Sequence, residues 1–186
     1  MSSQVLSDAM RLLLLDLGYE PESETVLRTP DRFADALMEM LQGYRESPVG
    51  ILKKTFDEPY DEMVIVNGIK FWSLCEHHAL PFHGVASVGY LPNGAVVGLS
   101  KIPRLVRCLS RRLQVQERLT NQIAEAIGEA LKPKGVGVLL RATHLCMVAR
   151  GVESHGEMVT SSLTGSFRQP EVREEFLRLA REGMRV

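Results

Sequence analysis

The chain has 186 residues, of which 45% are hydrophobic and 24% are charged, and its formal net charge at pH 7 is -1. These proportions are typical of a soluble globular protein and exclude an intrinsically disordered chain. The near-neutral charge argues against a protein that binds polyanions over its whole surface. The length suggests one domain that buries a sizeable core.

The N-terminus lacks the pattern of a targeting or membrane segment. It has no basic stretch followed by an apolar run and a small-residue cleavage site, and Asp16 interrupts the leucine run at 12–15. The sequence therefore predicts a cytoplasmic protein that makes no membrane contact. Because cysteines stay reduced in the cytoplasm, we expect Cys75 and Cys146 to be thiols and not a disulfide.

The first predicted elements are helices. Residues 3–17 have a helical pattern that ends at Gly18. Residues 29–43 form a clearer helix, in which Thr29 serves as N-cap and Pro30 occupies the first helical position.

The hydrophobic period then changes to that of strands. Residues 63–74 are interpreted as two short strands around an Asn-Gly hairpin signal at 67–68. A second strand–turn–strand pattern covers 82–91, the turn residues 92–94, and 95–99.

The rest of the chain alternates between the two periods. Residues 103–131 are predicted to be helical, 136–149 and 157–167 extended, and 170–182 a terminal helix. This order of helices and strands predicts an α+β fold with a mainly antiparallel sheet.

One cysteine and three histidines lie within LCEHHALPFHG, residues 74–84. A turn that leaves a strand can direct the Cys75 sulfur and the His78 imidazole toward one metal ion. On a predicted strand, His144 and Cys146 point to the same face and can supply the missing partner.

We interpret the cluster as a three-ligand zinc site made by Cys75, His78 and Cys146, with a fourth position open to water. Catalytic zinc sites keep such a position, and His77 and His144 would then act beside the metal as proton carriers. Two alternatives stay open: a closed structural Cys₂His₂ site, and unconnected core cysteines with hydrogen-bonded histidines.

A basic run, LSKIPRLVRCLSRRLQVQER, covers residues 99–118. Ser100 is a predicted N-cap, and the free backbone N–H groups that follow it can bind phosphate together with Lys101 and Arg104. We assign the arginines at 107, 111 and 112 to a solvated face. A solvated helix face is also the alternative for the whole run.

Polar residues interrupt the apolar stripe of the predicted helix 103–131. Gln116 and Thr120 fall on the stripe and Glu117 flanks it. Buried polar groups must be paired, or the helix must break there. A carboxylate at this point can accept the N–H donors of a guanine edge, and a helix–helix junction with local hydrogen bonds is the alternative.

Taken together, six motifs resemble the signatures of the GTP cyclohydrolase I family, over roughly residues 25–182. They are SLCEHHALPFHG, YLPNGAVVGLSKIPRLV, RRLQVQERLTNQIA, PKGVGV, HLCMVARGV and VTSSLTGSF. The resemblance implies the tunnelling fold, in which antiparallel strands pack with paired helices. It also implies a toroidal homodecamer with active sites at subunit interfaces. Residues 1–186 would then form one domain, with an N-terminal helical region over 1–60 and a catalytic core over 61–186.

The resemblance also implies an activity, the zinc-dependent conversion of GTP and water to 7,8-dihydroneopterin triphosphate and formate. This is the first step of tetrahydrofolate and pterin biosynthesis. The matching motifs imply Cys75, His78 and Cys146 as zinc ligands and His77 and His144 as catalytic histidines. The implied substrate contacts are Ser100, Lys101, Arg104 and Arg150 for the triphosphate and ribose, and Gln116 and Glu117 for guanine.

Two other functions remain as alternatives. The first is a related zinc enzyme of the same fold that opens the ring but makes a different product, such as a cyclic phosphate or another pterin. The second is a non-catalytic, zinc-stabilised module that binds nucleotides or nucleic acid. The aromatic content of 6%, with no aromatics interleaved in the basic run, argues against single-strand binding, and we expect no nucleic-acid partner.

Overall fold

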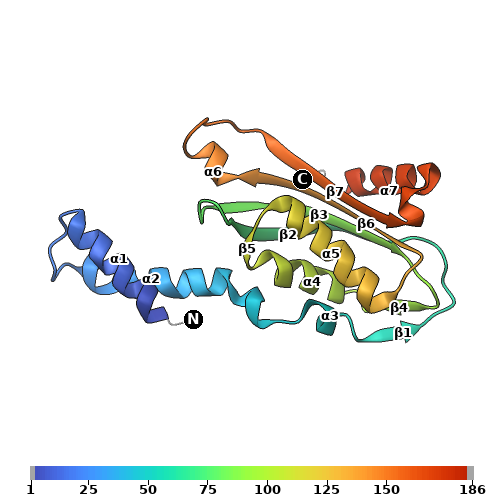
Figure 1. Cartoon of the computed structure of the whole chain (residues 1–186), viewed down its shortest axis with the longest axis horizontal. Helices are drawn as coiled ribbons and strands as arrows, with labels where there is room; N and C mark the ends of the chain where they lie inside the picture. Colours follow the sequence, from blue (N-terminus) through green and yellow to red (C-terminus); the bar gives the residue numbers. More distant parts are fainter. Residues whose placement is uncertain (1–2, 184–186) are drawn as a thin grey trace. The chain divides into compact units, whose positions relative to one another are not determined.

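The computed structural model of the chain describes residues 3–183 (Figure 1). Two compact units succeed one another in the sequence, and the boundary falls between Gln42 and Gly43. The predicted single domain over 1–186 includes residues 1–2 and 184–186, which lie outside the described residues. The one-domain organisation stays a prediction.

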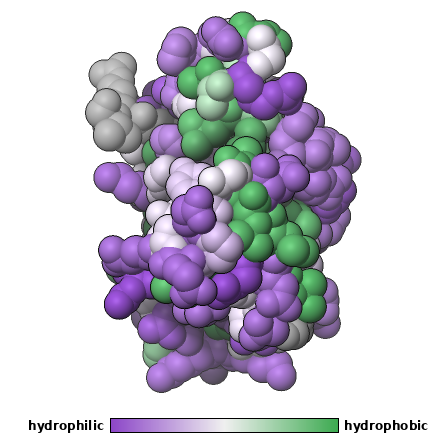
Figure 2. All heavy atoms as spheres, turned by 90° about the vertical axis from the view of Figure 1, so that its left-hand side faces the viewer, coloured by the Kyte–Doolittle hydropathy of each residue, from purple (hydrophilic) through white to green (hydrophobic). Residues whose placement is uncertain are grey.

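The first unit is a pair of helices, α1 (Ser3–Asp16) and α2 (Glu24–Met40), that pack against each other. The Ser7 hydroxyl donates a hydrogen bond of 2.7 Å to the Asp31 carboxylate and links the two helices. Leu14 of α1 is buried, whereas Leu12 and Leu17 are 67% and 64% exposed. Figure 2, seen from the side on which these helices are drawn in Figure 1, shows hydrophobic patches between hydrophilic ones. Exposed apolar patches of this kind are typical of interaction surfaces.

The start of α2 differs from the prediction. The helix begins at Glu24 because Ser23 is the N-cap, and the Ser23 hydroxyl accepts a hydrogen bond from the Val26 N–H. Thr29 is therefore not the N-cap, and Pro30 lies inside the helix and not at its first position. The earlier capping residue decides where the helix starts.

The second unit is built on a five-stranded sheet whose spatial order is β5-β2-β3-β6-β7. All pairs are antiparallel except β2 with β5. Its strands are β2 (Val64–Cys75), β3 (Pro81–Leu91), β5 (Leu113–Gln114), β6 (Gly135–His144) and β7 (Glu157–Gly165). A separate two-stranded sheet joins β1 (Thr55–Asp57) to β4 (Ala95–Val97).

Helices cover both faces of the large sheet (Figure 1). The helices α4 (Lys101–Ser110) and α5 (Gln116–Leu131) lie on one face, and α7 (Pro170–Glu182) lies on the other. Successive side chains of a strand point to opposite faces. Accordingly, Val138 and Leu140 of β6 join the core under α4 and α5, while Leu139 packs with Phe176 of α7.

The predicted α+β class is confirmed, with an antiparallel sheet packed with helices. In the sequence, the antiparallel strand pairs β2–β3 and β6–β7 stand before and after the helices α4 and α5. This is the order of elements expected of the tunnelling fold. The remaining short elements are η1 (Gln42–Arg45), α3 (Pro48–Ile51), α6 (Leu145–Val148) and η2 (Ser166–Arg168).

Two strand predictions are wrong in detail. Residues 63–74 form one strand and not a hairpin, since β3 pairs with both halves of β2 and the register shifts between Val66 and Ile69. Gly68, with φ of +69°, accommodates this β-bulge. The strand after the turn at 92–94 pairs with β1 and not with β3.

The predicted helix 103–131 is two helices. Between them, Leu113 and Gln114 form β5 on the edge of β2, and the Arg112 guanidinium donates to the Gly43 carbonyl at 2.8 Å. Arg112 therefore does not belong to a solvated face. The helix breaks just before the polar residues at 116 and 120 that interrupt the apolar stripe.

Candidate active site

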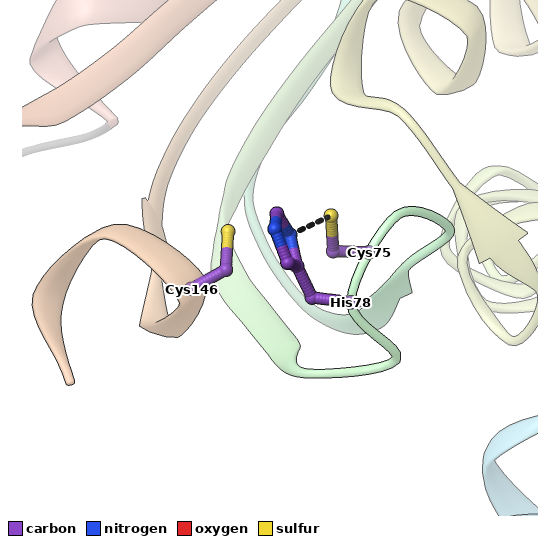
Figure 3. A group of neighbouring side chains, drawn as sticks. All are labelled: Cys75, His78 and Cys146. Atoms are coloured by element: carbon purple, nitrogen blue, oxygen red, sulfur yellow. Dashed lines mark hydrogen bonds between the residues drawn. The ribbon is translucent and has the colours of Figure 1, made fainter. Parts of the chain in front are cut away.

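The predicted metal ligands Cys75, His78 and Cys146 are called the metal group below. Its first half, Cys75 and His78, comes from the tight turn between β2 and β3. Cys75 is the last residue of β2, and its carbonyl accepts a hydrogen bond of 2.8 Å from the Ala79 N–H. Ala79 has φ of +53°, a left-handed conformation that closes the turn. The Cys75 N–H donates to the Leu80 carbonyl at 2.8 Å. The turn places the His78 ring beside the Cys75 sulfur, with 3.8 Å between Nδ1 and Sγ (Figure 3).

The second half comes from α6. The sequence predicted that His144 and Cys146 lie on one face of a strand, and this is wrong, because β6 ends at His144 and Cys146 lies in the helical turn that follows. The turn nevertheless brings Cys146 to the other half-site. The ligand atoms of Cys75, His78 and Cys146 all lie within 4.8 Å of one another (Figure 3).

The donor set suits a metal ion. All three cysteines of the chain are free thiols. Burial raises the pKa of Cys146 above its ordinary value, and the neighbouring Cys75 raises that pKa further, while the Arg150 charge lowers it. Two thiols and an imidazole at this spacing match the ligands of tetrahedral sites for borderline and soft divalent ions. The group can therefore hold a metal ion.

His77 lies beside this group but outside its three mutually close ligand atoms. Its Nδ1 is 3.9 Å from the Cys75 sulfur, and its Nε2 is 3.8 Å from a Glu76 carboxylate oxygen. Both outer nitrogens of the Arg118 guanidinium donate to Glu76. This hydrogen bonding holds the pKa of Glu76 below its ordinary value. In the sequence, Arg118 belongs to a basic run, and no local pattern indicates that it binds Glu76 in the turn that carries the metal ligands.

His144 is half-buried between a phenyl ring and an amide. Its ring is stacked on Phe82, its partner in the β3–β6 register, with centroids 4.5 Å apart and 5° between the planes. Its Nε2 lies 2.8 Å from Oε1 of Gln116. Burial lowers the pKa of His144 below its ordinary value, and the charge of Glu117 opposes this shift. Phe82 was not predicted, since its role depends on a register that the sequence does not reveal.

The remaining predicted contacts at this end of the sheet have different surroundings. Gln116 is buried at the start of α5, and the Thr120 hydroxyl donates to its carbonyl at 2.7 Å. Glu117 is exposed on the same turn. Arg150 is exposed just after α6, close enough for its charge to lower the pKa of Cys146. The structure therefore brings Gln116, Glu117 and Arg150 together with the two half-sites.

The three other predicted triphosphate contacts lie elsewhere. Ser100 occupies the N-cap position of α4, but its side chain makes no capping hydrogen bond with a described residue. Lys101 is the first residue of α4, and Arg104 is exposed one turn later.

These residues follow β4, at the Tyr90 end of β3, where the Val97 N–H donates to the Tyr90 hydroxyl at 3.1 Å. The metal group and His144 lie at the Phe82 end (Figure 1). The strand rises about 27 Å between Phe82 and Tyr90. Within one chain, the structure therefore does not bring Ser100, Lys101 and Arg104 to the metal group.

Two other residues of the predicted motifs have different surroundings. His83 stacks on Trp72, with ring centroids 4.3 Å apart. Cys108 is buried in α4, and burial raises its pKa. No helix among residues 3–183 combines the length and apolar character needed to cross a membrane.

Comparisons with known proteins agree with the motifs. A family model described as GTP cyclohydrolase I matches residues 6–181. The chain is 52% identical to GTP cyclohydrolase 1 of Chlorobaculum tepidum over 94% of this chain and 79% of that protein. It is also 52% identical to GTP cyclohydrolase 1 of Homo sapiens, over 95% of this chain and 72% of the human protein.

Among solved structures, the archaeosine synthase QueF-Like in the apo form resembles 56% of this chain and 95% of its own, with a TM-score of 0.42 and 22% identity. That likeness is too slight to support an argument.

Proposed function

The chain belongs to the GTP cyclohydrolase I family, and from that premise we propose that it converts GTP and water to 7,8-dihydroneopterin triphosphate and formate. This reaction is the first step of tetrahydrofolate and pterin biosynthesis. The observation that carries the proposal is the convergence of Cys75, His78 and Cys146, with His144 held at the adjoining end of β6.

The metal of this group is zinc in our proposal. Two thiolates, one imidazole and a fourth position open to water make the donor set of a catalytic zinc site. The chemistry that zinc supplies when bound there is activation of water for attack on carbon-8 of the guanine imidazole ring.

The chain's own histidines manage protons in this proposal. His144 protonates the ring nitrogen that becomes a leaving amine, and its half-buried position suits a group that must work without bulk water. His77, which is exposed beside Cys75, moves protons around the hydrated carbon. The amines freed by ring opening and release of formate then close the pterin ring after the ribose rearranges.

The substrate contacts are shared between chains in this proposal. Glu117 recognises guanine and Arg150 contacts the ribose and triphosphate at the Phe82 end of the sheet, where the predicted guanine contact Gln116 is buried beside His144. Ser100, Lys101 and Arg104 bind the triphosphate from a second copy of the chain, because one GTP molecule does not span the length of β3. The exposed apolar side chains of α1 support association of copies, and a homodecamer with interfacial sites satisfies both requirements.

The direct test is incubation of purified, metal-analysed protein with GTP. We expect one formate per GTP consumed, and mass spectrometry should identify 7,8-dihydroneopterin triphosphate. A cyclic phosphate or a different pterin would instead identify a related enzyme of the same fold. Absence of turnover, together with unfolding on chelation, would identify a zinc-stabilised binding module, because structural zinc contributes folding free energy.

A further inference from the structure

We propose that the Gln116 side chain is a positioning residue, which holds the His144 ring and sets which of its nitrogens carries the proton in the neutral ring. The inference rests on the proposed function, since it concerns the histidine that would protonate the substrate. It departs from a role of this side chain in binding guanine.

Backbone carbonyls fix the orientation of the Gln116 amide. Its Nε2 lies 3.1 Å from the Met158 carbonyl oxygen and 3.4 Å from the Leu140 carbonyl oxygen. In the reversed orientation, Oε1 would face two acceptors with no hydrogen between them. The nitrogen must therefore face β6 and β7, and Oε1 must face His144.

This orientation determines the role of the histidine. The amide oxygen is an acceptor, so the contact of 2.8 Å requires Nε2 of His144 to donate. In the neutral ring, Nδ1 is then the unprotonated nitrogen that can accept a proton. Stacking on Phe82 restrains the plane of the same ring. A hydrogen bond and a stacked ring together leave His144 one orientation.

Two threonines extend the network. The Thr120 hydroxyl uses its hydrogen on the Gln116 carbonyl at 2.7 Å. The Thr160 hydroxyl must therefore donate its own hydrogen to Thr120, 2.7 Å away, and accept from Nε2 of Gln116 at 3.1 Å. The two amide hydrogens of Gln116 therefore face three acceptors, the Thr160 hydroxyl and the carbonyls of Met158 and Leu140. Helix α5 and strand β7 thus both support the position of the amide.

Burial separates this role from substrate binding. Gln116 is 1% exposed, and the acceptors around Nε2 use both amide hydrogens. No amide donor remains for a guanine edge. The exposed carboxylate of Glu117, on the next residue, is free of this constraint.

The test compares three variants of the full-length, zinc-loaded protein. Gln116→Met keeps the approximate volume and removes the amide. Thr160→Val removes one contact of the amide without touching His144. Thr164→Val is the matched control, because Thr164 lies on the same strand and its hydroxyl bonds to the backbone of Val136.

We expect Gln116→Met to lower kcat roughly 10- to 100-fold, as loss of a histidine's hydrogen-bonding partner does in metal sites. The KM for GTP and the zinc content should stay near those of the wild type, because an orienting group contributes in the transition state more than in binding. Thr160→Val should lower kcat in the same way but less, and Thr164→Val should behave as the wild type.

A raised KM with unchanged kcat in Gln116→Met would overturn the inference and favour a guanine contact. Unchanged kcat in both Gln116→Met and Thr160→Val would also overturn it. A crystal structure of Gln116→Met gives a readout independent of turnover: the His144 ring should leave its position on Phe82, and an unmoved ring contradicts the inference. Wild-type protein that releases no formate contradicts the proposed function instead.

Discussion

The two ends of the large sheet carry the two groups of predicted site residues in contrasting states. At the Phe82 end, the side chains form hydrogen bonds with one another: Cys75 with His78, Arg118 with Glu76, and His144 with Gln116. At the Tyr90 end, the side chains of Ser100, Lys101 and Arg104 make no hydrogen bond or ion pair with any residue among 3–183.

The difference agrees with the proposal that the Tyr90 end binds the triphosphate at a site shared with a second copy. At the Phe82 end, or metal end, which carries the metal group, the fold itself positions the side chains. A reacting centre requires this, because a reaction slows steeply when its catalytic groups are misplaced. The Tyr90 end, or basic end, offers only the N-terminus of α4 with the cations Lys101 and Arg104, an arrangement that suits the binding of an anion. Each of the following variants changes one end and leaves the other intact.

Removing a metal ligand should have the largest effect. Cys146→Ala leaves two ligands, and we expect loss of stoichiometric metal and of formate release. Because a catalytic ion does not hold the core together, the circular dichroism spectrum should be retained. Cys108→Ala, which removes a buried cysteine of α4 away from the metal group, should keep both metal and activity. Unfolding of Cys146→Ala would instead indicate a structural ion.

His144→Ala should have the next largest effect. Loss of the proton carrier should lower kcat by about 10²- to 10⁴-fold, while the metal content and the fold are retained. Metal analysis and formate release measured on the same sample check this outcome. Near-normal turnover would rule out the assigned role.

At the other end of the sheet, Arg104→Ala should weaken substrate binding and spare the chemistry. Loss of one charge-assisted hydrogen bond to phosphate should raise the KM for GTP about 10- to 100-fold with little change in kcat. Arg107→Ala, which removes an exposed charge one turn further along α4, serves as the control. Equal effects of the two variants would show that the surface charge acts without a specific contact.

The rates of thiol alkylation should distinguish the cysteines from one another, and this is the smallest expected effect because it involves no loss of turnover. In the zinc-loaded protein we expect Cys75 and Cys146 to be protected. After chelation, Cys146, which is partly exposed, should react slowly because burial raises its pKa. Cys108 should stay unmodified until the chain unfolds, since it is buried and its pKa is also raised. Peptide mapping by mass spectrometry checks the order, and early labelling of Cys108 would contradict it.

Much of the metal end could be predicted from local sequence. The spacing of Cys75 and His78 identifies a half-site, and the polar residues at 116 and 120 indicated that the long helix must break or pair them. Both occur, since the helix breaks at residues 111–115 and Thr120 bonds to Gln116.

Features that depend on long-range pairing were not predictable. The Asn-Gly signal at 67–68 became a bulge because β3 is long enough to pair with both halves of β2. Phe82 reaches His144 through the β3–β6 register, and Thr160 reaches Gln116 from a strand 40 residues beyond its partner Thr120. Local periodicity contains no information on which strands become neighbours.

A mixing experiment tests most directly whether the two ends, from different copies, form one site that acts on GTP. Cys146→Ala and Arg104→Ala chains are co-expressed and purified as mixed assemblies, and formate release is compared with that of each variant alone at a low GTP concentration. Shared sites predict that activity returns in the mixture, because some interfaces then combine an intact metal end with an intact basic end. If the mixed assemblies are no more active than the average of the two separate variants, the site lies within one chain and the account is contradicted.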